Sequence, residues 1–588
     1  MQPRDDASRR CPLSPAVLTK RCRTMSTIRS PFWPAHLATR QAPPATHLFR
    51  QAEAAAARHP DKPFILFYDT PVSFARFQHE AEHVAGFLQQ RCGVKAGDRV
   101  LLDMQNSPQW MIAYYGILRA NAVVVPVNPM NMTDELAHYI EDSGASTVIV
   151  AQDLYPRIAP LVGSAGGLAH VVVATYGDYV AQPSAVAVPD FVAAPRHVDG
   201  PGVIHWSDVL AEQLKPGELT AGPDDICVMP YTSGTTGKPK GCVHTHRSVM
   251  CTAAGFVDWF DDPEDAIHLA VLPLFHVTGM QGGLNGPLVR GSTVVVLPRW
   301  DRDAAGRAIG RNRVSVWQSI STMMVDFLSN PNLHEYDLSS LRSMRGGGAA
   351  MPDAIARKLK ESVGLDYVEG YGMSETIAAT HINPPAHPKP QCLGIPVFDV
   401  DARIVDPVTF QPVPQGEVGE IVVHAPQLMQ GYWRNPEATR QTFVEIDGKR
   451  FLRTGDLGRI DADGYFFMAD RLKRMINASG YKVWPAEVET MMYRHPAIKE
   501  VCVIGTRSAH RGETVKAFVV LDPAYPDGVT PDDVVAWARD HMASYKVPRI
   551  VEFVESLPKS GSGKIMWREL QEREEAAAAA AVQGDAVA

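Results

Sequence analysis

The segment YTSGTTGKPKG, residues 231–241, determines how the rest of the chain is interpreted. Glycines let a backbone approach an anion closely, and Ser, Thr and Lys side chains add donors and positive charge, so this composition is typical of a phosphate-binding loop. It is not a Walker A loop, because Pro239 stands where that motif needs Ser or Thr. The apolar residues 227–231 are expected to form a buried strand that leads into the loop. Taken alone, the segment fits a nucleotide clamp and a Gly-rich surface turn equally well.

The composition of the whole chain excludes several classes of protein. Its 588 residues are too many for one compact core, so about two to four domains are expected. The 45% hydrophobic and 21% charged residues argue against disorder, and a net charge of -8 gives no basic signature for nucleic acid. The eight cysteines form no CxxC pair, which indicates a reducing compartment without structural zinc. No apolar run reaches the roughly 20 residues that span a bilayer. A cytoplasmic protein is expected, with peripheral membrane contact and oligomeric state left open.

The two ends differ in composition from the rest of the chain. Residues 1–24 are basic but lack the apolar core of a signal peptide, and they are expected to be a non-native or disordered extension before Met25. A transit peptide is the alternative, which Asp5 and Asp6 disfavour. Residues 571–588 contain an Ala run and a small polar tail, and we expect them to be disordered.

From about residue 46 to residue 469, short apolar runs alternate with helical patterns. Strands are expected at residues 98–104 and 122–127, with a helix at residues 110–120 between them. Such alternation predicts parallel sheets covered by helices.

The pattern changes twice toward the C-terminus. Residues 397–405 and 417–424 alternate with period two, which predicts a small barrel-like or antiparallel subdomain. Beyond residue 470, strands near residues 501–504 and 515–520 and a helix that opens at Thr530 predict a compact α+β unit. The expected fold class is α/β: a large N-terminal domain of parallel α/β sheets with a small barrel-like subdomain, followed by a small mobile α+β lid.

Residues 79–83, HEAEH, match the HExxH pattern of zinc proteases. At about 100° per residue, the apolar side chains of this stretch share one helix face, and they are Phe74, Phe77, Ala81, Val84 and Leu88. His79 and His83 fall nearly opposite and should face water, whereas a zinc site shields both histidines and adds a third ligand. We interpret the pattern as the polar face of an amphipathic helix. There is also no GxSxG sequence, so a hydrolase serine is not supported.

Further segments accompany the loop in a fixed order. They are LPLFH at residues 272–276, GGGAA at 346–350, GYGMSET at 370–376, TGD at 454–456, DRLK at 470–473, GYKV at 480–483 with Glu487, and PKSGSGK at 558–564. Together with residues 231–241 they closely resemble the signature of the adenylate-forming superfamily: acyl-CoA synthetases, peptide-synthetase adenylation domains and beetle luciferases. The resemblance covers about residues 45–570.

The resemblance implies a domain organisation and a reaction. Residues 25–469 would form an AMP-binding N-terminal domain, residues 470–473 a hinge and residues 474–570 a C-terminal lid, with the active site between them. A carboxylate and ATP would give an acyl-adenylate and pyrophosphate, and thiol attack would then give a thioester and AMP. The implied small molecules are a carboxylic acid, ATP, Mg²⁺ and CoA.

The resemblance also assigns residues to the nucleotide. A carboxylate is already ionised at pH 7, so the first step needs positioning and electrostatic stabilisation rather than a base. Glu375 and Thr235 are the implied Mg²⁺ ligands, Asp456 the ribose ligand and Tyr371 the ring that stacks on adenine. The full nucleotide set is Thr232, Ser233, Gly234, Thr235, Thr236, Gly237, Lys238, Gly347, Gly348, Ala349, Gly370, Tyr371, Gly372, Met373, Ser374, Asp456 and Arg471.

Four further residues are implied to act during or between the two steps. Lys564, in a Gly- and Ser-rich loop, would bridge the acyl carboxylate and the α-phosphate as a point charge. Lys473 would be the pivot of the lid, and Gly480 would face the pantetheine channel. His276 would orient the thiol, with a core histidine as the alternative.

The acid itself is less well defined by the sequence. The segment before His276 is apolar, with no charge to pair with an ammonium group, so an acid without an amine is favoured. The residues expected at its pocket are Met280, Gly282, Gly283, Trp317, Ser319, Thr322 and Met323, whose small or soft side chains suit a medium- or long-chain fatty acid. Aryl acids, an acyl-AMP ligase that loads a carrier protein, and a nucleotide-binding scaffold without activity are the alternatives.

Overall fold

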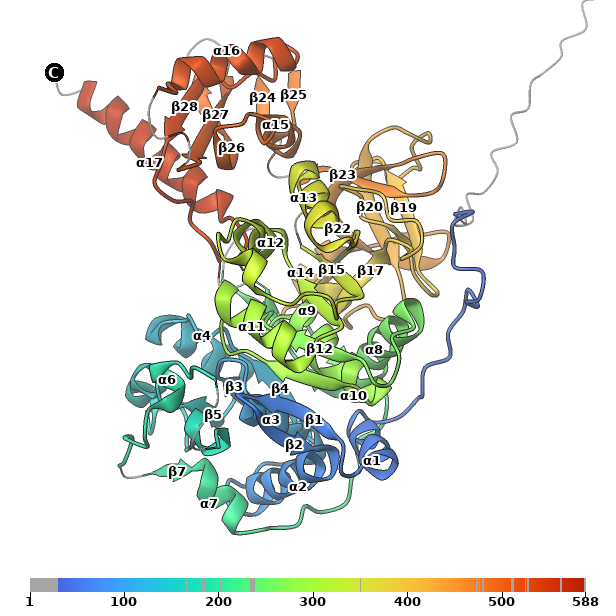
Figure 1. The fold of residues 1–588 in the computed structure, drawn as a ribbon, viewed down its shortest axis with the longest axis vertical. Helices are drawn as coiled ribbons and strands as arrows, with labels where there is room; N and C mark the ends of the chain where they lie inside the picture. Colours follow the sequence, from blue (N-terminus) through green and yellow to red (C-terminus); the bar gives the residue numbers. More distant parts are fainter. Residues whose placement is uncertain are drawn as a thin grey trace, which may run out of the picture.

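The computed structural model of the chain contains two α/β sheets, an antiparallel sheet and a C-terminal unit (Figure 1). It describes residues 30–164, 167–181, 186–200, 202–232, 238–348, 350–471, 474, 476–478, 481–508, 512–523, 525, 528–560 and 563–585. The expectations for residues 1–24 and for hinge residues 472 and 473 lie outside this part of the chain.

The largest sheet has nine strands in the order β18-β17-β16-β15-β14-β12-β13-β1-β2. They are β1 (Pro63–Phe67), β2 (Thr70–Ser73), β12 (Ile267–Ala270), β13 (Thr293–Val296), β14 (Val316–Ser319), β15 (Ser343–Gly347), β16 (Tyr367–Met373), β17 (Ala378–Ile382) and β18 (Ile395–Pro396). Strands β1 and β12 to β16 run parallel. Their C-terminal ends therefore meet at one edge, which is where open α/β sheets bind ligands.

The second sheet has seven strands in the order β11-β8-β4-β3-β5-β6-β7. They are β3 (Arg99–Asp103), β4 (Val123–Pro126), β5 (Thr147–Ala151), β6 (His170–Ala174), β7 (Val203–His205), β8 (Ile226–Val228) and β11 (His244–Thr245). Strands β3 and β4 pair in parallel, and helix α3 (Pro108–Arg119) connects them, as predicted. The strand expected at residues 227–231 is wrong in length, since β8 ends at Val228. Pro230, which follows, has no N–H to continue the ladder.

Helices cover both faces of the nine-stranded sheet. Val294 and Val296 of β13 belong to one core, shared with the seven-stranded sheet, and Val295 belongs to another, because side chains alternate along a strand. The first core includes residues of α1 (Phe49–Arg58), α2 (Phe74–Gln90), α3 and α8 (His246–Phe260), and the second includes residues of α11 (Arg302–Asn312), α12 (Ser321–Leu328) and α13 (Asp353–Val363). The nine-stranded sheet is therefore the central layer of the molecule.

The predicted barrel-like subdomain is a five-stranded antiparallel sheet. Its strands are β19 (Asp401–Val405), β20 (Gly419–His424), β21 (Phe443–Ile446), β22 (Lys449–Ile460) and β23 (Phe466–Arg471). The predicted antiparallel arrangement is confirmed by the pairing of β19 with β20, although both strands are buried on both faces. Strand β22 pairs with β20, β21 and β23, and this places Asp456 opposite Arg471.

The C-terminal unit has its own small core. Strands β24 (Ile476–Ala478), β25 (Tyr481–Val483), β26 (Ile498–Ser508), β27 (Gly512–Leu521) and β28 (Ile550–Phe553) pack with helices α15 (Pro485–Met492) and α16 (Pro531–His541). The hydroxyl of Thr530 caps α16 by accepting from the backbone N–H of Asp533 at 3.2 Å, as the sequence predicted. In Figure 1 this unit lies beyond α12 and α13, at one end of the molecule.

The C-terminal tail differs from expectation. Residues 571–585, expected to be disordered, continue helix α17 (Trp567–Asp585). The Ala run that indicated low complexity is also the residue type with the highest helix propensity. Lys516 of β27 and Thr506 of β26 both contact the Glu574 carboxylate, at 2.6 and 2.7 Å, and join the start of this helix to the C-terminal unit.

Helix α2 confirms the interpretation of the HExxH stretch as an amphipathic helix. All five apolar positions of the predicted face are buried, whereas His79 is exposed as expected and His83 is half-buried. Glu80 accepts from Arg76 at 2.6 Å and from the hydroxyl of Tyr179. The glutamate of the pattern therefore packs helix α2 against neighbouring residues.

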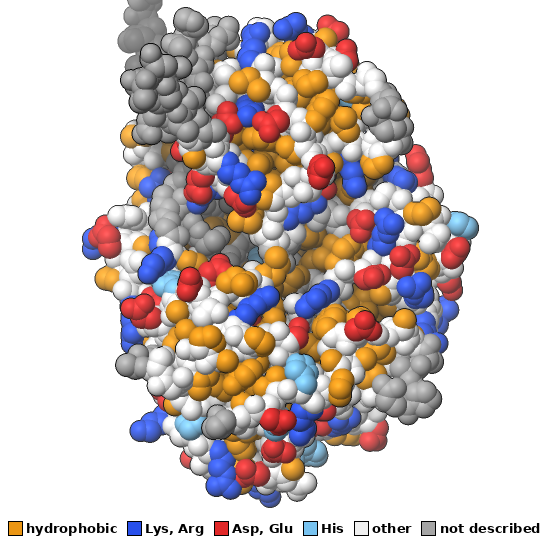
Figure 2. Space-filling view, turned by 90° about the vertical axis from the view of Figure 1, so that its left-hand side faces the viewer, with side chains coloured by type: hydrophobic (Ala, Val, Ile, Leu, Met, Phe, Trp, Pro, Cys, Tyr) orange, Lys and Arg blue, Asp and Glu red, His pale blue; other side chains and the backbone are white. Residues whose placement is uncertain are grey.

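The surface carries both signs of charge. On the face drawn in Figure 2, blue and red side chains are interspersed with hydrophobic ones, and the described residues form no continuous basic patch there. None of the described helices has the length and apolar character needed to cross a membrane.

Candidate active site

A cleft of about 2690 Å³ opens where the C-terminal ends of β14, β15 and β16 face strand β22 and the C-terminal unit. It brings together most of the predicted site residues that the structure describes. Those at its lining are Thr232, His276, Gly347, Gly348, Gly370, Tyr371, Gly372, Met373, Ser374, Glu375, Asp456 and Lys564. Lys238 is described but exposed, and it is not part of the lining.

Some predicted positions lie outside the described residues. They are Ser233, Gly234, Thr235, Thr236, Gly237, Ala349, Lys473 and Gly480. The backbone of Arg471 is described, opposite Asp456 in the β22–β23 pair, but its side chain is not. At the phosphate loop, Thr232 and Lys240 pair across the short ribbon β9 (Tyr231–Thr232) and β10 (Lys240–Gly241), which fixes the two ends of the loop.

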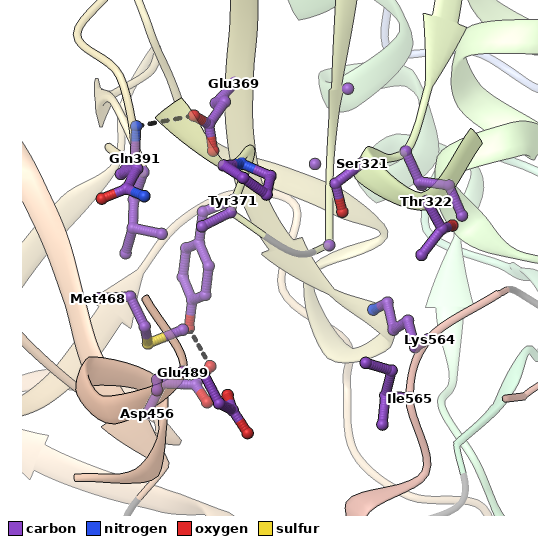
Figure 3. A pocket seen from close by; sticks show the side chains of 18 of the residues that line it. Ser321, Thr322, Glu369, Tyr371, Gln391, Asp456, Met468, Glu489, Lys564 and Ile565 are labelled. Carbon is purple, nitrogen blue, oxygen red and sulfur yellow. Dashed lines mark hydrogen bonds between the residues drawn. The ribbon is translucent and has the colours of Figure 1, made fainter. Parts of the chain in front are cut away.

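Tyr371 and Asp456 meet in the cleft, at the end where the sequence analysis expects the nucleotide. Tyr371, on β16, is 7% exposed, and its hydroxyl donates to Oδ2 of Asp456 at 2.7 Å (Figure 3). Asp456 comes from β22 of the antiparallel sheet and is 3% exposed. A buried carboxylate is costly unless it is hydrogen-bonded, so this bond helps to keep an acceptor group at the strand end. The contact joins the nine-stranded sheet to the antiparallel sheet.

Glu375 lies one turn beyond the end of β16. Its side chain is 5% exposed, and Oε1 accepts from the hydroxyl of Tyr432 at 2.7 Å. Burial and the neighbouring Glu375 carboxylate raise the pKa of Tyr432 well above its usual value, so the phenol stays a donor. An oriented carboxylate at the lining of a cleft fits a hard cation such as Mg²⁺.

Glu369 is a lining residue that the sequence analysis did not single out. Its Oε1 accepts from the backbone N–H of Gln391 at 2.9 Å, and its Oε2 accepts from that of Met351 at 3.3 Å (Figure 3). Burial raises the pKa of this carboxyl to about 8. The side chain therefore ties the loop that follows Gly348 to the loop before β18. No pattern in the sequence marks it beyond its place beside the GYG segment.

Lys564 enters the cleft from the segment that precedes α17. A Cβ added at Gly348 would lie 2.9 Å from Cε and 3.3 Å from Nζ of Lys564, so the lysine packs directly against the Gly348 backbone, whose φ of +87° favours glycine. Figure 3 shows Lys564 extending toward the strand end near Ser321 and Thr322. The lysine thus connects the C-terminal segment to the edge of the nine-stranded sheet.

His276 lies on the same side of the cleft as Lys564. It caps helix α9 (Val277–Met280), where its Nδ1 accepts from the backbone N–H of Thr278 at 3.3 Å. Burial, and next the charge of Lys564, lower the pKa of His276 to about 3. The imidazole is therefore neutral at physiological pH and is available as a polar, uncharged group beside the lysine.

The residues expected to line the acid pocket are partly wrong. Trp317 and Met323 are 0% and 8% exposed and belong to the core between the nine-stranded sheet and helices α11, α12 and α13. Alternation along β14 instead points Gln318 into the cleft, where its amide lies against Gly282. Thr322 lines the cleft as expected. The sequence analysis assigned Trp317 and Ser319 of β14 to the pocket, but these odd-numbered positions lie on the face toward α12.

Comparison with known proteins gives a consistent result. The family model for AMP-binding enzymes matches residues 52–433, and the model for the C-terminal domain of these enzymes matches residues 487–564. The chain is 36% identical to a long-chain-fatty-acid–CoA ligase of Bacillus subtilis (strain 168) over 528 residues, 88% of this chain and 93% of that one. It is 34% identical to a feruloyl-CoA synthase of Amycolatopsis over 506 residues, 86% of this chain and 94% of that one.

A solved structure shows the same fold. The anthranilate CoA ligase AuaEII in complex with anthranoyl-AMP superposes with a TM-score of 0.82 and is 28% identical, covering 92% of this chain and 100% of that one. The match includes both the two large sheets and the C-terminal unit, because it extends over nearly the whole chain.

Proposed function

The chain belongs to the AMP-binding enzyme family and is an AMP-forming acyl-CoA synthetase that uses ATP, Mg²⁺ and CoA, and from that premise we propose how its own residues divide the work. The observation that carries the proposal is the meeting of Lys564 with Gly348 and His276 in the cleft that also holds Tyr371 and Asp456. These residues come from segments far apart in the chain and converge on one space.

In the first half-reaction, Tyr371 and the Gly347–Gly348 backbone hold adenine, and Asp456 accepts from the ribose hydroxyls. A carboxylate with two oxygens suits two neighbouring hydroxyl donors. Lys564 approaches the acid carboxylate and the α-phosphate together, which offsets the repulsion between two anions and places the attacking oxygen. Glu375 would hold Mg²⁺, and the charge of the ion would stabilise the pyrophosphate leaving group. The phosphate loop, residues 232–238, binds the β- and γ-phosphates.

In the second half-reaction, the acyl-adenylate carbonyl is attacked by the thiol of CoA, and AMP leaves. The neutral His276 orients the thiol. Lys473 is the pivot about which the lid, residues 474–570, turns away from the N-terminal domain, residues 25–469, and Gly480 borders the pantetheine channel. A Gly480→Leu variant that still forms the acyl-adenylate but no longer forms the thioester would support that arrangement.

The acid is proposed to be a medium- or long-chain fatty acid, which the Bacillus subtilis relative supports by its name. An aryl acid is the second candidate, and it is favoured by the names of the feruloyl-CoA synthase and of the anthranilate CoA ligase. The reaction would take place in the cytoplasm, where ATP and CoA are available.

An assay for thioester formation tests this proposal. Purified enzyme is incubated with ATP, Mg²⁺ and CoA and a panel of fatty and aryl acids, and the products are identified by mass spectrometry. We expect acyl-CoA from at least one acid and none when ATP is omitted. Absence of a thioester with every acid would contradict the proposal, and transfer to a carrier protein but not to CoA would change the acceptor.

A further inference from the structure

Arg345 of β15 lines the cleft and lies on the face of the nine-stranded sheet opposite α11, α12 and α13. In the register of the sheet it is opposite Gln318 of β14 and Val368 of β16, so the three side chains share one face. That face is covered by α8, whose Phe256 and Phe260 also line the cleft. Arg345, Gln318 and Val368 therefore border one part of the cleft, which we call the acid end.

The guanidinium of Arg345 is buried but only partly paired. Arg345 is 6% exposed, its Nη2 donates to Oδ2 of Asp262 at 2.5 Å, and its Cζ lies 3.8 Å from the ring centre of Phe260. Its Nη1 is buried and has no hydrogen-bond partner among the described residues. A buried donor without an acceptor is unfavourable, so a ligand that accepts from Nη1 would complete the site.

Two neighbours extend this polar end. An added Cβ at Gly282 would lie 1.4 Å from Oε1 of Gln318, so the glycine provides the space that the Gln318 amide occupies. His268 of β12, on the same face, is 5% exposed, and its Nε2 also has no hydrogen-bond partner among the described residues. Burial and the nearby Arg345 keep this imidazole uncharged.

The distance from the reacting group suits the far end of an acid. Strand β15 leads from Arg345 through Gly346 and Gly347 to Gly348, which contacts Lys564. Three residues along a strand span about 10 Å. An acid whose carboxylate lies beside Lys564 can therefore place a distal group at Arg345.

We propose that Arg345, with Gln318 beside it, is a specificity-determining residue that binds an uncharged oxygen acceptor at the far end of the acid, such as a hydroxyl, alkoxy or carbonyl group. This inference rests on the proposed function and names the substrate class of that same site. A second carboxylate fits less well, because Asp262 already neutralises the guanidinium and would repel another anion. A plain alkyl end would leave Nη1 unpaired.

The experiment compares acids that differ only at the far end. Octanoate is paired with its terminal-hydroxyl derivative, cinnamate with its para-methoxy derivative, and octanedioate tests the charged alternative. We expect the native enzyme to prefer the oxygenated member of at least one pair in kcat/KM. Equal kcat/KM within both pairs overturns the inference and leaves the proposed function standing, whereas no thioester from any acid overturns both. A preference for octanedioate overturns the uncharged acceptor.

Two variants assign the preference to the residues. Arg345→Met should lower kcat/KM for the oxygenated acid about 10- to 100-fold and leave the value for its unsubstituted partner within about threefold, since one charged donor is lost. Gln318→Leu replaces a neutral side chain, so it does not deprive Asp262 of its ion-pair partner as Arg345→Met does. It should reduce the preference for the oxygenated acid by a smaller factor than Arg345→Met. The KM for ATP should stay unchanged in both, and this separates a lost donor from a misfolded enzyme. Equal losses for both acids of a pair would overturn the inference.

Discussion

The buried polar groups at the two ends of the cleft differ in how completely they are hydrogen-bonded. At the nucleotide end, the Asp456 carboxylate accepts from Tyr371, and the Glu375 carboxylate accepts from Tyr432. At the acid end, Arg345 has a paired Nη2 and an unpaired Nη1. The first end is organised before a ligand arrives, which lowers the cost of binding a common co-substrate. The second leaves a donor to be satisfied by the substrate, which is how a polar site discriminates between acids.

The largest effect is expected at the junction of the two ends. Lys564→Ala should slow formation of the acyl-adenylate about 100- to 1000-fold, because it removes the charge that we propose to lie between the acid carboxylate and the α-phosphate. Thioester formation from supplied acyl-adenylate should be nearly unchanged. Pyrophosphate exchange measures the first step, and CoA-dependent release of AMP from acyl-adenylate measures the second.

Lys559→Ala is the matched control, because Lys559 lies in the same segment but is exposed and pairs with Glu500 at 2.7 Å. It should leave both half-reactions unchanged. Equal loss of both steps in Lys564→Ala would mean that this lysine does not belong to adenylation alone.

The next largest effect is expected at the nucleotide end of the cleft alone. Asp456→Asn should raise the KM for ATP about 10- to 100-fold, since it replaces the charged side chain that we propose as acceptor of the ribose hydroxyls by a neutral one. The ranking of acids in the panel should stay as in the native enzyme. A changed ranking would show that the two ends are not independent.

Asp103 is a buried carboxyl outside the cleft, and it serves as a comparison for Arg345 because no ligand is expected to bind it. Asp103 is 2% exposed, its Oδ1 has no hydrogen-bond partner among the described residues, and burial raises its pKa to about 7 from a usual 3.8. The folded state therefore holds a proton that the unfolded state releases between these pH values. Stability falls as pH rises through this window, by up to about 1.4 kcal/mol per pH unit.

Asp103→Asn should remove that dependence, so the melting temperature of the variant, relative to the native enzyme, should increase from pH 5 to pH 8. Glu361→Gln, at an exposed position of α13, serves as the control and should show no such trend. A constant difference between Asp103→Asn and the native enzyme would show that an unsatisfied buried group costs little here, which would weaken the argument for Arg345.

The smallest effect is expected from a single neutral donor. Tyr371→Phe keeps the ring that we propose to stack on adenine and removes the hydrogen bond to Asp456, so the KM for ATP should rise only about two- to tenfold. Steady-state kinetics with ATP varied at saturating acid measure this effect. A loss as large as that of Asp456→Asn would mean that the hydroxyl, and not the carboxylate alone, recognises the ribose.

The same contrast explains what the sequence could predict. The nucleotide end is made of contiguous segments such as GYGMSET, whose residue types show their chemistry, and the parallel sheets follow from alternating apolar runs. The acid end takes one residue from each of several strands. Gln318 was missed because a one-residue error in strand parity exchanges the two faces, and Arg345 was missed because nothing beside it in the chain indicates a pocket. Glu369 acts through two backbone N–H groups that only the folded chain brings to it.

The attack of the acid carboxylate on the α-phosphate of ATP is the step on which the proposed function rests. It is tested most directly with an acid whose carboxylate carries ¹⁸O, with ATP, Mg²⁺ and CoA present. One carboxylate oxygen becomes the bridge of the acyl-adenylate and stays on phosphorus when the thiol attacks the carbonyl carbon. We therefore predict one ¹⁸O atom in each AMP and none in the inorganic phosphate products. Label in inorganic phosphate, with ADP in place of AMP, would contradict the account.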